Sequence, residues 1–223
     1  MNILALESST DLCSAALWQD GMTDAREAAA GQRNSEVLLP MVDALLNSHG
    51  LTAATLDAVA FGSGPGSFTG LRIACGIAQG IAFGAGVPVL GIGTLLALAE
   101  SSKAQRVVCC LDARMGEIYH AAYERRGGEW QTVLSPTLCK PEAAPELPAG
   151  KWAGGGSGFA AYRAVLDVCY AGRLENVMVN LAPHAKAIAI LAAVEFRSGN
   201  AVAAECASPL YVRNKVALRV DER

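Results

Sequence analysis

The stretch NILALESSTDLCSAALWQDG, residues 2–21, predicts a β-hairpin whose pattern returns at residues 107–128. Its apolar strand NILAL runs into the turn ESSTD, and the second strand LCSAALW is followed by the polar turn QDG. The later stretch, VVCCLDARMGEIYHAAYERRGG, repeats the order of strand, turn and strand, and Leu111-Asp112 matches Leu6-Glu7. Either the chain carries an internal duplication or it holds two unrelated hairpins, and so few identities leave both interpretations open.

The rest of the chain alternates strands with helices. Between the hairpins, apolar periodicity predicts a helix over 35–48, a strand over 57–62, a glycine loop with a helix after it, and a strand and helix in GVPVLGIGTLLALA. Beyond the second hairpin we expect a strand near 130–134, a proline-rich connection, and helices near 158–170 and 184–197. The order βββαβαβα, with the polar link SSK at 101–103, predicts an α/β protein of two similar lobes, residues 1–102 and 103–223.

The composition indicates a globular intracellular protein. Hydrophobic residues make up 52% and charged residues 17%, which favours a surface partly covered by a partner. The net charge of −3, without a run of Lys or Arg, argues against tight nucleic-acid binding by this chain alone. The seven cysteines include no C-x-x-C pair, and the start MNILALESST lacks a basic n-region, so we expect a cytoplasmic location.

One uncharged stretch resembles a membrane span in length. Residues 73–99 contain no charged side chain. The sequence GAGVP at 84–88 interrupts this stretch, so we predict a helix, a break and a buried strand, and no membrane association.

The loop GSGPGSFTGLR, residues 62–72, is rich in glycine but matches neither nucleotide-binding fingerprint. A Walker A loop needs a Lys, and none occurs before Lys103. The dinucleotide pattern G-x-G-x-x-G fails at Ser67. What remains is a helix capped by Ser67 or Thr69, either as an anion site or as a tight turn that needs positive φ.

The helix after this loop has Gly76, Gly80 and Gly84 at every fourth position. Each glycine destabilises an isolated helix by roughly 1 kcal/mol relative to Ala, so close packing must compensate. The stripe either packs inside the chain or contacts a helix of another chain.

The chain offers few candidates for catalysis. His49, His120 and His184 are isolated, and no G-x-S-x-G elbow occurs. Glu7 and Asp112, at matching turns of the two hairpins, could face each other around a hydrated Mg²⁺, or could be ordinary turn acids.

Taken together, ILALESST, GSGPGSFTGLR, IAQGIA, VPVLGIGTLLALA, LDARMGEIY and PLYVRN closely resemble the TsaB (YeaZ) family. The resemblance covers nearly the whole chain. It implies a duplicated, two-lobed actin-like (ASKHA) fold and a role in tRNA threonylcarbamoyladenosine synthesis. Many relatives have His-Ser where this chain has Asn34-Ser35, which leaves the role of Asn34 in doubt.

The resemblance also implies a non-catalytic partner subunit. In the catalytic sister family, TsaD, a motif H-x-x-x-H binds a metal, and the matching positions here are Thr94 and Leu98. We therefore expect no catalytic residue and no metal, and a chain that activates a TsaD-type transferase, with a TsaE-type ATPase in a larger complex and tRNA bound only through that complex. The expected interface comprises Leu38, Met41, Leu45, Ser67, Phe68, Arg72, Gly76, Gly80 and Gly84.

Two other functions stay open at this point. An actin-like phosphotransferase would use Glu7 and Asp112 around Mg²⁺, with Gly154 and Gly155 beside adenine, although Ser8 stands where a phosphate-contacting glycine usually follows the first acid. We expect no cofactor, or at most weak nucleotide or Mg²⁺ binding at this vestigial site. A tRNA-binding module is the third alternative, and the acidic balance argues against it. The sequence also leaves open whether the first-lobe helices close a homodimer.

Overall fold

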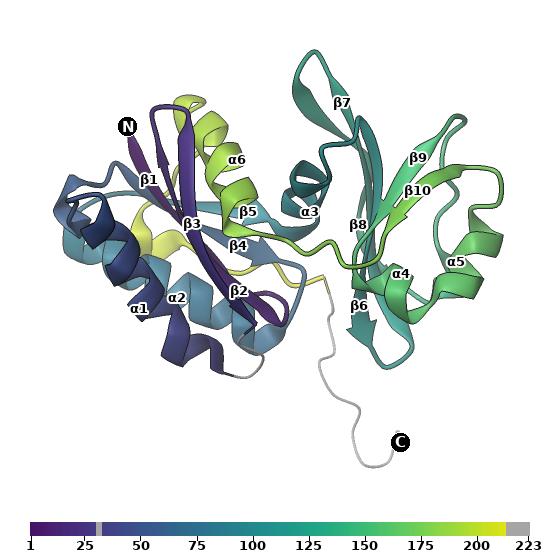
Figure 1. Cartoon of the computed structure of the whole chain (residues 1–223), viewed down its shortest axis with the longest axis horizontal. Coiled ribbons are helices and arrows are strands. Elements are labelled where there is room, and N and C mark those ends of the chain that lie inside the picture. Colours follow the sequence, from purple (N-terminus) through teal and green to yellow (C-terminus); the bar gives the residue numbers. More distant parts are fainter. Residues whose placement is uncertain (30–32, 213–223) are drawn as a thin grey trace.

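The computed structural model describes residues 1–29 and 33–212, which form two lobes around two five-stranded sheets (Figure 1). The first sheet consists of β1 (Asn2–Glu7), β2 (Leu12–Gln19), β3 (Met22–Ala29), β4 (Ala58–Gly64) and β5 (Val89–Gly93). Its order is β3-β2-β1-β4-β5, in which β1 pairs antiparallel with β2 and parallel with β4.

The second sheet repeats this topology. Its strands are β6 (Arg106–Arg114), β7 (Glu117–Arg126), β8 (Glu129–Cys139), β9 (Trp152–Gly155) and β10 (Leu174–Met178). Its order is β8-β7-β6-β9-β10, in which β6 pairs antiparallel with β7 and parallel with β9, as β1 does with β2 and β4; β8 pairs antiparallel with β7, and β10 pairs parallel with β9. The internal duplication is therefore confirmed, and the interpretation as two unrelated hairpins is wrong. The protein has the α/β actin-like fold of two similar lobes.

Helices cover both faces of the first sheet. Helices α1 (Asn34–Ser48) and α2 (Phe68–Ala85) lie side by side on one face, and α6 (Ala185–Arg197) covers the other (Figure 1). Strand β1 alternates accordingly, because Leu4 and Leu6 pack toward α1 and α2, whereas Ile3 and Ala5 pack toward α6.

The position of α6 corrects the expected division of the chain at 103–223. Its buried residues Ile188 and Ala192 pack on the first sheet. After α6, Val202 pairs with Val89 of β5, and the chain runs on as a segment, 202–212, that lies against α2. We call this segment the strap. The second sheet thus ends with β10, and the chain then returns to the first lobe.

The second lobe has shorter helices than expected. The single helix predicted near 158–170 is two pieces, α4 (Ser157–Ala161) and α5 (Arg163–Cys169), separated at Tyr162. Helix α3 (Thr94–Ser102) lies between the lobes (Figure 1) and packs against the second sheet. The adjacent Cys109 and Cys110 of β6 face opposite sides of that sheet, one toward α3 and the other toward α4 and α5.

Contacts with the β1–β2 turn require glycine at three positions of the glycine loop. A Cβ on Gly62 would lie 2.0 Å from Glu7 Oε2, and one on Gly66 would lie 2.6 Å from Ser9 Cβ. A Cβ on Gly70 would lie only 1.8 Å from the Ser8 carbonyl oxygen. These glycines therefore allow the turn to lie directly against β4 and the first turn of α2.

A positive φ is needed at only one glycine of this loop. Gly64 has φ +122, and a Cβ there would also lie 2.6 Å from the Leu210 carbonyl oxygen of the strap. Helix α2 then begins with Ser67 as its N-cap, whose side chain accepts a hydrogen bond from Gly70 N–H at 3.3 Å. Of the two predicted caps, Ser67 is confirmed and Thr69 is not.

Helix α2 is long and apolar enough to cross a membrane by length and composition alone, and core helices pass the same test. It ends at Gly86, which has φ +70, and β5 follows, so the expected order of helix, break and strand is confirmed. Only 33% of its residues are buried, and Phe83 is its one large apolar side chain that is exposed.

The glycine contacts predict opposite effects for two substitutions in the same helix. Gly70→Ala places a methyl group against the Ser8 carbonyl and should lower the free energy of unfolding by about 3 kcal/mol or more. Gly76→Ala meets nothing within 4 Å and should raise it by roughly 0.5–1 kcal/mol. Urea denaturation measures both values. Equal, small changes in the two variants would contradict the packing described here.

The second lobe buries an uncharged histidine. His120 of β7 is fully buried, and neither ring nitrogen has a hydrogen-bond partner among the described residues. Its ring centroid lies 6.3 Å from that of Tyr170, whose hydroxyl is also unpartnered. Burial lowers the pKa of His120 to about 4.

This shift predicts a pH dependence of stability. Between about pH 6.5 and 4 the unfolded chain binds a proton at His120 while the folded chain does not, so stability falls as the pH falls. The loss approaches about 3 kcal/mol and levels off below pH 4. His120→Leu should remove this part of the pH dependence. The measurement is the free energy of unfolding of the wild type and of the variant at each pH. If the difference between the two free energies stays constant from pH 7 to pH 4, the pH dependence does not come from His120.

Candidate functional site

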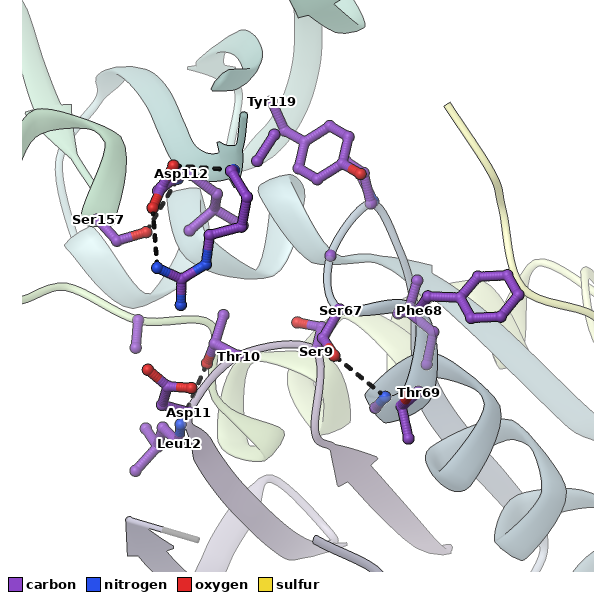
Figure 2. A pocket seen from close by; sticks show the side chains of 18 of the residues that line it. Ser9, Thr10, Asp11, Leu12, Ser67, Phe68, Thr69, Asp112, Tyr119 and Ser157 are labelled. Carbon is purple, nitrogen blue, oxygen red and sulfur yellow. Dashed lines mark hydrogen bonds and ion pairs between the residues drawn. The ribbon is translucent and has the colours of Figure 1, made fainter. Parts of the chain in front are cut away.

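A cavity of about 1300 Å³ separates the two lobes (Figure 2). In Figure 2, Asp112 and Ser157 of the second lobe lie on one wall, and Ser9, Thr10 and Ser67 of the first lobe lie on the other. Two duplicated turns thus approach the cavity from opposite sides, together with the glycine loop and the end of the strap.

Asp112 is held in the wall of this cavity by a tight hairpin. Its backbone N–H donates to Ser157 Oγ at 3.0 Å, and its carboxylate accepts from the Arg114 N–H at 2.9 Å and from the Arg114 guanidinium at 3.3 Å. Arg114 and Met115 have φ of 62 and 56, which are left-handed values that non-glycine residues rarely adopt. The turn therefore presents these two side chains to the cavity at some cost in backbone strain.

Glu7 does not join Asp112 at this cavity. It is fully buried, does not line the cavity, and accepts a hydrogen bond from Ser9 N–H at 2.6 Å. Burial raises its pKa, which disfavours the charged form that would bind a cation. The described residues contain no cluster of three His, Cys, Asp or Glu that could hold a metal ion. Of the two interpretations of these acids, the geometry does not support a pair around Mg²⁺, because only Asp112 lines the cavity.

The glycines expected beside adenine are packed within the second lobe. A Cβ on Gly154 would lie 2.8 Å from the Phe159 ring, and one on Gly155 would lie 3.0 Å from Leu181 Cδ2. Both lie in β9 and are buried. Phe159 and Leu181 therefore pack directly on these two glycines, and neither glycine lines the cavity.

The positions that match the metal-binding histidines of TsaD are also structural. Thr94 is fully buried, and its Oγ1 accepts a hydrogen bond from Gly64 N–H at 3.1 Å. Leu98 is fully buried in the cluster that joins α3 to the second sheet. Neither side chain is free to bind a ligand.

Among the described residues, nothing packs closely on the glycine stripe of α2. A Cβ on Gly76, Gly80 or Gly84 would meet no atom of residues 1–29 and 33–212 within 4 Å. The described residues therefore do not support the interpretation that this stripe packs inside the chain. Phe83 on the same helix is 77% exposed, although it is a large apolar residue.

The first helix contributes less to this surface than expected. Leu38 and Leu45 have no exposed surface and belong to the core beneath α1, so they cannot contact a partner directly. Met41 is partly buried and packs against the same core. The apolar side of α1 packs on the first sheet, as the apolar side of a surface helix usually packs on the core.

At the start of α2, Tyr211 of the strap packs against two residues of the expected interface. The Arg72 guanidinium lies 3.7 Å from the Phe68 ring centroid, and its Nε donates to the Tyr211 hydroxyl at 3.0 Å. The Phe68 and Tyr211 rings lie 5.5 Å apart. Ser67, expected at the interface, is exposed as well as being the cap of α2. In the sequence, Tyr211 was noticed only as part of the motif PLYVRN, which did not indicate that it would contact Phe68 and Arg72.

A second, smaller hollow lies farther along α2. It has a volume of about 240 Å³ and is lined by Gln79, Gly80 and Phe83 of α2 and by Ala204 and Glu205 of the strap. It joins the open glycine face to the strap.

Comparison with known proteins gives consistent matches over nearly the whole chain. The family model described as TsaD, tRNA N6-adenosine threonylcarbamoyltransferase, matches residues 28–218. The tRNA threonylcarbamoyladenosine biosynthesis protein TsaB of Escherichia coli (strain K12) is 37% identical over 97% of this chain and 96% of its own length. The TsaB protein of Haemophilus influenzae is 36% identical over 97% and 95%. The solved structure of YeaZ from Pseudomonas aeruginosa is similar with a TM-score of 0.84 and 36% identity, covering 94% of this chain and 99% of that one.

The packing around the cavity predicts no response to nucleotide. Mg-ATP should leave the melting temperature unchanged, because Glu7 is buried away from the cavity and Gly154 and Gly155 are packed against Phe159 and Leu181. A nucleotide bound only by the folded chain, at one hundred times its Kd, would add about 2.7 kcal/mol. Differential scanning fluorimetry with MgCl₂ alone as the control measures this. A rise with Mg-ATP that disappears in Asp112→Ala would favour a phosphotransferase instead.

Proposed function

Because the chain belongs to the TsaB (YeaZ) family, a family of tRNA threonylcarbamoyladenosine biosynthesis proteins, we propose that it is a non-catalytic partner of a TsaD-type transferase. It binds that enzyme through the open face of α2 and activates it, and the transferase carries out the threonylcarbamoyl transfer to adenosine. The TsaE-type ATPase joins the resulting complex, and tRNA contacts this chain only within it. The setting of these steps is the cytoplasm.

The open glycine stripe is the observation that carries this proposal. Three glycines at one helix face weaken α2 by roughly 1 kcal/mol each, and no contact within the described chain compensates for them. Glycines that lie bare on a helix allow the backbone of a second helix to approach closely. The neighbouring Phe83 and Arg72 are residue types that are enriched in protein interfaces.

The burial of three side chains supports the proposed lack of a catalytic role. Thr94 and Leu98 are used for packing, and Glu7 is buried away from the cavity. The formal charge of −3 supports the proposal that tRNA binding depends on partner subunits.

Substitution at Gly80 tests the proposed interface. Gly80→Leu should weaken binding to the TsaD-type transferase about tenfold or more, because the branched side chain keeps the two helix backbones apart. The isolated chain should become slightly more stable, since Leu is a better helix former and Gly80 has open space beside it. Calorimetric titration measures the affinity, and urea denaturation measures the stability.

The matched control is Gly80→Ala, which adds one methyl group and should weaken binding less than Leu does. The transfer reaction on tRNA should require both proteins, and its rate should fall with Gly80→Leu at limiting concentrations of this chain. Transfer by this chain alone, or unchanged affinity of a folded Gly80→Leu variant, would contradict the proposal.

A further inference from the structure

The groove beside Gly80 joins two segments that are far apart in the sequence. Gln79, Gly80 and Phe83 of α2 form one side, and Ala204 and Glu205 of the 3₁₀ turn Ala204–Cys206 form the other. Its volume is about 240 Å³, and it opens widely to solvent. It can therefore receive one large apolar side chain, such as Leu, Met or Phe, from a partner.

The strap holds this groove open in the free chain. The Ala207 carbonyl oxygen accepts a hydrogen bond from Gln79 Nε2 at 3.0 Å and a longer one from Cys75 Sγ at 3.8 Å. On the other side of the turn, Val202 and Val89 exchange both backbone hydrogen bonds, at 2.9 and 2.8 Å. Because the strap is fixed on both sides of the 3₁₀ turn, the groove exists before a partner binds, which reduces the entropy lost on association.

The rim of the groove has a specific chemistry. Phe83 is 77% exposed and provides an apolar wall. Glu205 is exposed at the opposite rim, and no ion pair to it forms within residues 1–29 and 33–212. The only charged side chain of α2, Arg72, lies two helical turns before Gln79. The complementary ligand is therefore an apolar side chain with a basic side chain next to it.

We propose that this groove is the socket that selects the partner helix. One large apolar side chain of the TsaD-type transferase enters between Phe83 and Ala204, and a neighbouring Lys or Arg of the same helix pairs with Glu205. The socket is continuous with the glycine face at Gly80, so a helix that crosses this face reaches the strap as well. This inference rests on the proposed function and adds the strap to the interface.

Two substitutions in the full-length chain test the socket. Phe83→Ala removes its apolar wall and should weaken binding to the transferase about tenfold. Glu205→Lys places two cations together and should weaken binding about fivefold at 50 mM salt, with a smaller effect at 500 mM because salt screens exposed charges. Both side chains are exposed, so the melting temperature of each variant should match that of the wild type.

The second lobe supplies matched controls. Val168→Ala truncates a side chain that is also 77% exposed, and Glu175→Lys reverses an exposed acid of β10; neither should change the affinity. Wild-type affinity of Phe83→Ala or Glu205→Lys, while Gly80→Leu still blocks binding, would overturn the socket and leave the proposed function standing. Wild-type affinity of all three variants would contradict both. If Phe83→Ala abolishes self-association in sedimentation and leaves transferase binding intact, the occupant is a second copy of this chain, which also overturns the proposal.

Discussion

The close approach of the β1–β2 turn to the glycine loop is the contact on which the first lobe depends. Gly62, Gly66 and Gly70 face Glu7, Ser9 and Ser8 at distances that leave no room for a side chain. The Ser8 hydroxyl also donates to the Gly70 carbonyl oxygen at 2.8 Å, and the Ser67 N–H donates to the Ser9 carbonyl oxygen at 2.8 Å, so the turn is hydrogen-bonded to the start of α2. This contact sets where α2 begins and how it lies on the sheet.

Once α2 is fixed in this way, its two faces serve different purposes. Leu71, Ala74 and Ala78 bury one face in the core of the lobe, whereas the face with the glycine stripe stays open. The strap then returns from α6 to lie along α2, with Leu210 N–H donating to the Ser63 carbonyl oxygen at 2.7 Å. The glycines of one continuous segment therefore have two physical roles. Those in the loop permit contact within the chain, and those in the helix permit contact with another chain.

The order of strands and helices could be predicted from the sequence because it is recorded in local periodicity. The two hairpins, a helix cap at Ser67 or Thr69 and the break after α2 followed from patterns within a few residues, whereas the duplication was one of two interpretations until the strand orders of the two sheets were compared. Contacts between distant segments could not be predicted in this way. Nothing near Gly70 indicates that Ser8 will lie against it, and the apolar pattern of α6 does not say which sheet it covers. For the same reason Leu38 and Leu45 were expected at the surface, although their side of α1 covers the first sheet, and the position of Glu205 beside Gly80 was not foreseen.

The central claim is that α2 and the strap together form the surface that a TsaD-type transferase covers. Hydrogen–deuterium exchange of the chain, with and without that enzyme, measures this surface directly. Exchange should slow at residues 76–86 and 202–208 on complex formation and stay unchanged in α4 and α5, which lie on the other lobe. Protection confined to α4, α5 or the cavity wall at Asp112, with α2 unchanged, would contradict the account.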